Sequence, residues 1–298
     1  MTYKVSSENY MFSFSKDIKP VLRVKSGEEV EIETMDCFAN QILTNEDKLE
    51  SLDWNRVNPA TGPIFVEGAQ PADALKVTIE KIQIGNRGIV ATGKDLGVLG
   101  HLMEGLYSRV LDIKDGEVIF NEDISFPINT MIGVIGVAPK EGSINCGTPG
   151  SHGGNMDTKL ITEGSVLYLP VFVEGALFGL GDLHAAMGDG EIGVSGVEVA
   201  GSVTVKLEVV KNMSIANPIV KTSDITATIA SAPTLEEAVT TATQDMANLL
   251  KQHTSMTMEE IATLMSAVGN LQFSQVVDPE KTVRFAMPNR ILERYNIL

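Results

Sequence analysis

The segment Ser202-Val-Thr-Val-Lys-Leu-Glu-Val-Val210 alternates apolar and polar side chains along most of its length. A period of two residues is typical of a β-strand with one buried face, because successive side chains of a strand point to opposite sides. The same alternation occurs in Val30-Glu-Ile-Glu-Thr34 and in Leu75-Lys-Val-Thr-Ile-Glu-Lys-Ile82. These three segments predict strands that have one face on a core and the other face in water.

Further strands are expected throughout Val21–Val210, where short apolar segments alternate with turn residues. In the run Val166–Val173 the odd- and even-numbered positions are both apolar, apart from Pro170. The run therefore predicts a central strand that is covered on both faces. The segment 112–120 predicts a β-hairpin, because Asp115-Gly116 can supply the positive φ angles of a tight turn. The first two thirds of the chain are therefore expected to be rich in β-structure.

The pattern changes after Asn217. Thr234-Leu-Glu-Glu237 and Thr257-Met-Glu-Glu260 both have the spacing of a helix capping box, and apolar residues follow each of them at helical intervals. Gly269-Asn270 then predicts the end of the second helix. We expect these apolar faces to pack on the sheets, so that a helical hairpin covers one end of the protein.

Together these patterns predict an α+β, β-rich fold, with mixed β-sheets or a sandwich and a C-terminal helical hairpin packed against them. The interpretation is one domain over residues 1–298, because no linker or repeat interrupts the chain. Within it we expect a β-rich part at residues 1–216, a helical segment at 217–270 and an extended tail at 271–298.

The composition is that of an ordinary globular protein, with 43% apolar and 21% charged residues in 298. The net charge of −16 would repel nucleic acid, so no nucleic-acid partner is expected. No apolar run approaches the roughly 20 residues that cross a bilayer. Cys37 and Cys146 lie far apart and no apolar leader is seen at the N-terminus, which favours a reducing, cytoplasmic location.

The richest concentration of polar groups lies in Gly181-Asp-Leu-His184 and the following Met187-Gly-Asp-Gly-Glu191. If the first segment is extended, its aspartate and histidine project from one face and can share a metal ion, or the carboxylate can orient the imidazole. The glycine-rich turn can return Asp189 or Glu191 to the same place. This spacing favours a metal or catalytic site over a purely structural hydrogen-bonded pair.

A second group lies in Ser151-His-Gly-Gly-Asn-Met-Asp157, where the glycines predict a loop. His152 is a candidate ligand or base, and the N–H groups around Gly153 and Gly154 can form a nest for an oxyanion. A tight surface loop with a solvated histidine explains the segment equally well when it is considered alone. The nearby Asp157 and the first group favour the functional interpretation.

Other candidates are weaker. Asp36 ends a predicted strand and can reach a site at the sheet edge, whereas Cys37 is more typical of a buried inert thiol. His101 is interpreted as structural or exposed, and His253 as a cap at the end of the first long helix. The chain contains neither a serine nucleophile elbow nor a phosphate loop or dinucleotide fingerprint. Water activated by a metal or by a carboxylate is the chemistry that remains.

Several longer segments of the chain together resemble the acetamidase/formamidase family. They are Asp36-Cys-Phe-Ala-Asn-Gln-Ile42, Val57-Asn-Pro-Ala-Thr-Gly-Pro-Ile-Phe-Val-Glu-Gly-Ala69, Met131-Ile-Gly-Val-Ile-Gly-Val-Ala-Pro139, Gly153-Gly-Asn-Met-Asp157, Leu167-Tyr-Leu-Pro-Val171 and Gly181-Asp-Leu-His-Ala-Ala-Met-Gly-Asp-Gly-Glu191. In one turn the chain departs from the pattern: Pro71-Ala-Asp73 stands where relatives usually have Pro-Gly-Asp. Since alanine disfavours positive φ, we expect a local difference in geometry there.

The resemblance implies hydrolysis of short linear amides such as formamide or acetamide to the carboxylate and ammonia. It also implies a β-rich mixed fold, assembly as a homodimer or higher homo-oligomer, and divalent metals such as zinc and calcium. The positions that match the polar signature of the family are Asp36, His152, Asp157, Asp182, His184, Asp189 and Glu191.

The hypothesis from sequence is a divalent ion, with zinc favoured and calcium at a second site, held by His184 with Asp182 or Asp36 and with His152 as a further candidate. Water activated there would attack the amide carbon, and the oxyanion would be stabilised by the metal and by Gly153, Gly154 and Asn155. Glu191, Asp157 or His152 would carry protons to the leaving ammonia. A small apolar pocket formed by Met156, Phe178 or Met187 is expected to limit the size of the acyl group.

Two alternatives remain open from the sequence. One is a hydrolase of a different carbon–nitrogen bond, because the residues that set the pocket volume cannot be assigned from spacing. The other is a non-catalytic, metal-stabilised protein that binds a small molecule.

Overall fold

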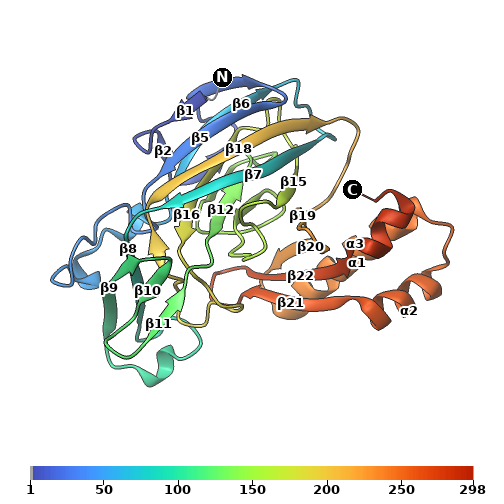
Figure 1. Ribbon diagram of the computed structural model, residues 1–298. Coiled ribbons are helices and arrows are strands. Elements are labelled where there is room, and N and C mark those ends of the chain that lie inside the picture. Colours follow the sequence, from blue (N-terminus) through green and yellow to red (C-terminus); the bar gives the residue numbers. More distant parts are fainter. Residues whose placement is uncertain (1–2, 298) are drawn as a thin grey trace.

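The computed structural model describes residues 3–297. Two large β-sheets face each other across the main core, and the helices lie together at the C-terminal end of the molecule (Figure 1). This arrangement confirms the expected β-rich α+β fold with a C-terminal helical hairpin.

Within residues 3–297 the first sheet has nine strands, in the order β1-β5-β18-β7-β15-β19-β20-β22-β21. Their bounds are β1 Tyr3–Val5, β5 Glu28–Thr34, β7 Ala74–Ile84, β15 Val166–Pro170, β18 Gly201–Val210, β19 Ile219–Lys221, β20 Ile225–Ala232, β21 Asn270–Gln275 and β22 Lys281–Pro288. The three segments with alternating patterns are the neighbours β5, β18 and β7, which pair in antiparallel register. Their predicted strands are therefore confirmed.

The second sheet has eleven strands in the same described range, in the order β11-β10-β9-β8-β17-β16-β12-β14, with β6 added on β16 and with β2 and β4 paired to β6. The bounds are β2 Tyr10–Met11, β4 Leu22–Lys25, β6 Ala60–Glu67, β8 Arg87–Gly93, β9 Leu106–Lys114, β10 Glu117–Ile119, β11 Ser125–Pro127, β12 Met131–Gly136, β14 Gly153–Asn155, β16 Phe178–His184 and β17 Glu198–Val199. A small ribbon pairs β3 (Ser13–Ser15) with β13 (Ser143–Asn145).

The main core is built from alternate side chains of both sheets. Ile32 and Val205 come from the first sheet, and Ile132 and Leu180 come from the second, and all four are fully buried. Burying a side chain of this size contributes about 1.5–3 kcal/mol. The period of two in the sequence therefore corresponds to the face that each strand turns to this core.

The apolar run around Pro170 behaves as expected for a covered strand, but it is shorter than predicted. It forms β15, which lies between β7 and β19 and ends at Pro170 rather than at Val173. Proline lacks the N–H that would continue the ladder. Asp182 and His184 belong to β16, a separate strand in the other sheet.

Helices α1 (Leu235–His253) and α2 (Met258–Val268) pack on β20 and β22 around a second apolar core, and the short α3 spans Asn289–Leu292. Both N-caps are threonines that accept a backbone hydrogen bond, and the second forms a full capping box. The helical hairpin is confirmed. Residues 219–232, expected in the helical part, instead form β19 and β20. No helix in residues 3–297 is long and apolar enough to span a membrane.

The expected extended tail forms the hairpin of β21 and β22, followed by α3. In Figure 1 this hairpin runs from the helical end towards the middle of the molecule. Its tip, residues 276–280, therefore reaches the region where β16 and β17 end. This placement brings C-terminal residues to the candidate site.

Two predictions concerned positive φ. The hairpin of β9 and β10 turns at Asp115 (φ 52°) and Gly116 (φ 81°), as expected. Ala72, however, has φ 76°, so the alanine adopts the conformation that we expected it to avoid. Hydrogen bonds to the next residue hold this turn, because the Asp73 carboxylate accepts from Gln70 and from the distant Lys211 and Asn212. Tertiary contacts therefore override the local preference of alanine.

Candidate functional site

The site is built around β16, which lies between β12 and β17 in the second sheet. The ladder between β12 and β16 pairs Ile132 with Leu183 and Val134 with Gly181, but the intervening pair, Gly133 with Asp182, is missing. Asp182 has φ 55°, which is not an extended conformation. The strand is therefore kinked at Asp182, and this kink sets the direction of its carboxylate.

His184 is the centre of a buried cluster. Its Nε2 atom lies 3.1 Å from Glu198 Oε2, 3.5 Å from Asp182 Oδ1 and 3.7 Å from Asp157 Oδ1, and only 1% of its side chain is exposed. None of these four atoms has a geometric hydrogen-bond partner among the described residues. Buried polar atoms without partners are rare, so the cluster is arranged for something that satisfies them.

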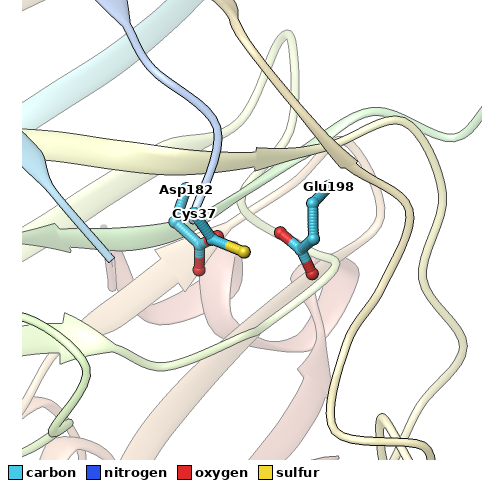
Figure 2. Close-up of side chains that lie close together, drawn as sticks. All are labelled: Cys37, Asp182 and Glu198. Atoms are coloured by element: carbon cyan, nitrogen blue, oxygen red, sulfur yellow. The ribbon is translucent and has the colours of Figure 1, made fainter. Parts of the chain in front are cut away.

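The donor set fits a divalent cation. Ligand atoms around a tetrahedral ion with bonds of 2.0–2.1 Å are separated by about 3.4 Å, which is close to the three distances around His184 Nε2. Two groups of three residues each have ligand atoms within 4.8 Å of one another. One is Asp157, His184 and Glu191, and the other is Cys37, Asp182 and Glu198 (Figure 2).

Negative charge is concentrated in this cluster. Burial raises the pKa of Asp157 and of Glu191 well above the usual carboxyl range, and it raises the pKa of Glu198 to about 7. Burial also acts to raise the pKa of Asp182, but the nearby His184 lowers it overall. For His184, burial would lower the pKa, but Glu198 and Asp182 raise it well above its ordinary value. A bound cation would relieve the repulsion among these carboxylates.

Two glycines make room for the cluster. A Cβ at Gly133 would lie 2.5 Å from Asp157 Oδ1 and 2.5 Å from Asp182 Oδ2. A Cβ at Gly196 would lie 2.5 Å from His184 Nδ1. The carboxylates and the imidazole therefore occupy space that any other residue at these positions would fill.

A cavity of about 410 Å³ opens beside the cluster. Its polar lining includes Asp182, Glu191, Glu198, Asn155 and Asp278. Its apolar lining comes from the segment that follows β5, from Ala91 and from two later loops. Cys37 lines the cavity as well.

Asp36 and Cys37 have different surroundings from those that the sequence suggested. Asp36 Oδ1 accepts hydrogen bonds from the N–H groups of Phe38 (3.0 Å) and Asn40 (2.8 Å), so it shapes the turn and is not a member of either ligand group. Cys37 is buried, as expected, but its thiol lies with Asp182 and Glu198 rather than in an inert core. Burial, and then the negative Glu198, raise the pKa of this thiol.

His152 is buried, so the alternative of a solvated surface loop is wrong. Its ring meets Phe14 edge to face, both ring nitrogens lack partners, and burial lowers its pKa to about 4. It belongs to neither ligand group. The N–H of Gly153 donates to the carbonyl of Gly150 and is thus not free for an oxyanion, and Gly154 pairs with Ile135 of β12.

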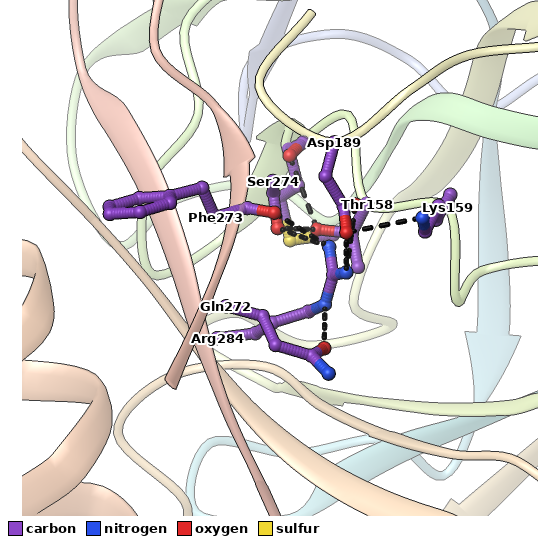
Figure 3. A network of polar contacts seen from close by, with 8 residues as sticks. Thr158, Lys159, Asp189, Gln272, Phe273, Ser274 and Arg284 are labelled. Carbon is purple, nitrogen blue, oxygen red and sulfur yellow. Dashed lines mark hydrogen bonds and ion pairs between the residues drawn. The ribbon is translucent and has the colours of Figure 1, made fainter. Parts of the chain in front are cut away.

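Asn155 and Glu191 do reach the cavity. The Asn155 side-chain amide donates to Asp278 Oδ2 at 3.0 Å, while its Oδ1 atom has no partner. Asp189 contacts a different set of residues (Figure 3). Both of its carboxylate oxygens accept hydrogen bonds from Arg284, at 2.8 and 2.9 Å, and its Oδ2 atom lies 3.1 Å from Lys159 Nζ. Of the two acids in this turn, only Glu191 belongs to a ligand group.

Glu198 and Asp278 were missed by the sequence analysis. Glu198 sits inside the apolar run Val197-Glu-Val199, and an isolated acid in a buried strand is a usable signal. Asp278 lies at the hairpin tip, and burial raises its pKa to about 8. Nothing in its local sequence distinguishes it from an ordinary turn aspartate.

The expected acyl pocket is also wrong. Met156 and Phe178 are fully buried in the main core, and Met187 lines a different surface hollow. The apolar lining of the site cavity comes from other residues, among them Phe38, Trp54 and Val57.

Comparison with known proteins identifies the family of this chain. The model of the Acetamidase/Formamidase family matches residues 4–145 and 143–294, which is nearly the whole chain. The chain belongs to the acetamidase/formamidase family. The resemblance that the sequence motifs suggested is thereby confirmed.

Solved structures of this family are closely similar. A predicted acetamidase/formamidase from Thermoanaerobacter tengcongensis is 66% identical, covering 100% of this chain and 99% of that chain, with a TM-score of 0.99. Acetamidase from Bacillus halodurans is 45% identical, covering 99% of this chain and 100% of that chain, with a TM-score of 0.97.

Among curated relatives, the formamidase of Methylophilus methylotrophus is 29% identical over an alignment of 275 positions, and the match covers 71% of this chain and 68% of the formamidase. The chain spans 63% to 68% of the length of the curated relatives it matches.

Proposed function

We propose that this member of the acetamidase/formamidase family is an amidohydrolase that cleaves linear primary amides to the carboxylate and ammonia. The observation that carries the proposal is the cluster of unpartnered buried ligand atoms around His184 beside a cavity that can admit a small molecule. The names of its relatives, formamidase and acetamidase, support the same chemistry.

His184, Asp157, Asp182 and Glu198 are proposed to hold a divalent cation. An imidazole among carboxylates favours zinc over calcium, because calcium prefers oxygen ligands alone. When bound, such an ion supplies Lewis-acid polarisation and lowers the pKa of water. The carboxylates of Asp182 and Asp157 can both approach Gly133 because this residue has no side chain. The chain therefore preorganises these two proposed ligands.

Two polar residues of the cavity serve the substrate in this proposal. Asn155 directs its amide nitrogen to Asp278, so its unpartnered Oδ1 can accept a hydrogen bond from the substrate carboxamide. Hydrolysis moves a proton from water to the leaving nitrogen, and Glu191 is the cavity carboxyl group proposed to carry it. Asp36 and His152 are proposed to be positioning residues. Asp36 holds the turn that follows it through two hydrogen bonds, and His152 packs its ring against Phe14.

The test is release of ammonia from formamide and acetamide by the purified protein, together with its metal content. We expect His184→Ala to lose at least about 100-fold in turnover and most of the bound metal, because the central ligand is removed. The exposed His101 provides a matched control, and His101→Ala is expected to retain both. A chelator should abolish turnover and zinc should restore it. Full turnover by His184→Ala would refute the assignment, and bound metal without turnover of any amide would favour a binding protein.

The finer expectations are also proposals. We propose zinc at the His184 cluster and calcium at a second site, a homodimer or higher homo-oligomer, and a cytoplasmic location. Exposed Leu271 and Phe273 on the edge strand β21 support assembly, because an unpaired apolar edge favours contact with another chain. Metal analysis and the mass of the particle in solution test these points.

A further inference from the structure

We propose that the preferred substrates are primary amides with an apolar acyl group larger than acetyl. The inference rests on the proposed amide hydrolysis and specifies the substrate class of the same site. It follows from the size of the cavity, from the apolar residues of its lining, and from two residues that the hydrolysis itself does not use.

The cavity is much larger than formamide or acetamide. At about 410 Å³ it falls within the range of roughly 300–1,000 Å³ that holds drug-sized ligands. Acetamide is about as large as three water molecules, or roughly 90 Å³. A short amide bound at the carboxylates would leave most of the cavity to water, whereas a longer acyl group would displace that water from apolar surface.

Several apolar residues line the cavity together with the carboxylates. Phe38, Val57 and Ala91 are among them, and they also belong to one apolar cluster under the segment that follows β5. Cys37 belongs to this cluster and to the ligand group with Asp182 and Glu198 (Figure 2), so apolar surface begins next to the carboxylates. An amide group at the carboxylates can therefore place its hydrocarbon part against this apolar cluster.

Trp54 is a further lining residue and has no evident structural role. It lines the cavity, yet 48% of it is exposed, and it is in none of the buried apolar clusters of residues 3–297. A large aromatic side chain at the edge of a cavity is typical of a ligand-binding surface. Covering its ring would bury apolar area that now faces water.

Val194 gives an independent indication. It lines the cavity with φ 81°, a left-handed conformation that is strongly unfavourable for a β-branched residue. Such strain is concentrated at ligand sites, where the surrounding structure fixes it. The loop after Glu191 thus presents a branched apolar side chain to the cavity.

The test is kcat/KM for ammonia release from formamide, acetamide, propionamide, butyramide and phenylacetamide. Each buried methylene should raise kcat/KM by about fourfold until the apolar lining is covered. Trp54→Ala should lower the ratio of the phenylacetamide value to the acetamide value by roughly tenfold, and Trp54→Phe should restore most of it. Tyr107 is the matched control, because this aromatic on β9 is 49% exposed and does not line the cavity.

Tyr107→Ala is expected to leave the ratio unchanged. If kcat/KM falls from acetamide to butyramide, or if Trp54→Ala and Tyr107→Ala change the ratio equally, the inference is overturned while hydrolysis of the short amides still supports the proposed function. If no amide in the series releases ammonia, the proposed function fails and the inference fails with it.

Discussion

At the scale of single residues, the carboxylates of the site have unusual backbone conformations. Asp157, Asp182 and Glu191 have φ angles of 41°, 55° and 46°. A non-glycine residue in the left-handed region costs about 1–2 kcal/mol. This cost persists at functional sites because it aims side chains where regular strands would not. The kink at Asp182 is the clearest case, since it interrupts an otherwise regular ladder.

Gly133 offers the sharpest test of this arrangement. Gly133→Ala is expected to reduce amide turnover and metal affinity by about 100-fold, because the new Cβ would displace the Asp157 and Asp182 carboxylates. Since the nearest atoms are ends of side chains, the protein should still fold, with a loss of about 1–3 kcal/mol in unfolding free energy. Turnover, metal content and circular dichroism measure these effects.

Gly188→Ala is the matched control, because a Cβ there would meet nothing within 4 Å. It should retain turnover and metal. Normal metal content in Gly133→Ala would contradict the role of that space.

At the scale of elements, the β-hairpin of β21 and β22 holds the loop that carries Glu191. Gly190 N–H donates to the carbonyl of Ser274 on β21, and Val276 N–H donates to the carbonyl of Gly190. Arg284 on β22 is 1% exposed and binds Asp189 with two hydrogen bonds. The same guanidinium donates to Gln272, Phe273 and Ser274, as Figure 3 shows. The β21–β22 hairpin thereby fixes a loop that joins two strands of the second sheet.

Arg284→Met should lower kcat by about 10- to 100-fold with little change in KM, because a small displacement of Glu191 affects the reaction more than binding. Arg284→Lys should restore part of kcat, since the positive charge remains while the bidentate geometry is lost. Steady-state kinetics of both variants on one amide provide the measurement.

Lys114→Met removes an exposed ion pair with Asp112 on β9 and is the control, with no change expected. Equal losses of kcat in the Met and Lys variants, or a change in KM alone, would argue against positioning by this ion pair.

At the scale of the whole molecule, two large apolar cores stabilise the fold and a polar site lies beside them. The main core joins the two sheets, the second core joins the helices to β20 and β22, and the site lies where the second sheet meets the C-terminal hairpin. Burial of ionisable groups at this junction links the stability of the protein to pH. His152 is the group for which the direction is simplest.

Burial lowers the pKa of His152 from 6.5 to about 4 in the folded protein. Between these values the unfolded chain binds more protons, so the unfolding free energy rises with pH in this window. The contribution of neutral His152 to the unfolding free energy is fully present above pH 6.5. It is lost as the pH falls towards 4, by on the order of 3 kcal/mol in total. Urea unfolding from pH 7.5 to 4.5 measures this loss.

The His152→Phe variant should lack the contribution of His152 to the pH dependence. The unfolding free energy of wild type minus that of the variant should therefore change by up to about 1.4 kcal/mol per pH unit between pH 6.5 and 4. Carboxylates of the site titrate in both proteins and cancel in the difference. His101→Gln, at an exposed position, should parallel wild type. Parallel curves for His152→Phe and wild type would show that His152 is not held neutral.

Local patterns in the sequence determined the strands β5, β7 and β18, the two long helices with their caps, and the family. These features depend on contacts between residues close in the chain, or on a period that one buried face imposes. The motifs also identified Asp157, Asp182, His184 and Glu191, which the structure brings to one cluster. Periodicity alone predicted where side chains alternate, but not the kink that gives Asp182 its direction.

Only the tertiary structure decided which other groups complete the site. Glu198 reaches His184 because β17 pairs with β16, and Asp278 reaches Asn155 because the C-terminal hairpin extends to the second sheet. Asp36 is satisfied by its own turn, and Asp189 is held by Arg284. Pairing between distant strands is set by the combined burial of many side chains, so no local stretch of sequence carries it.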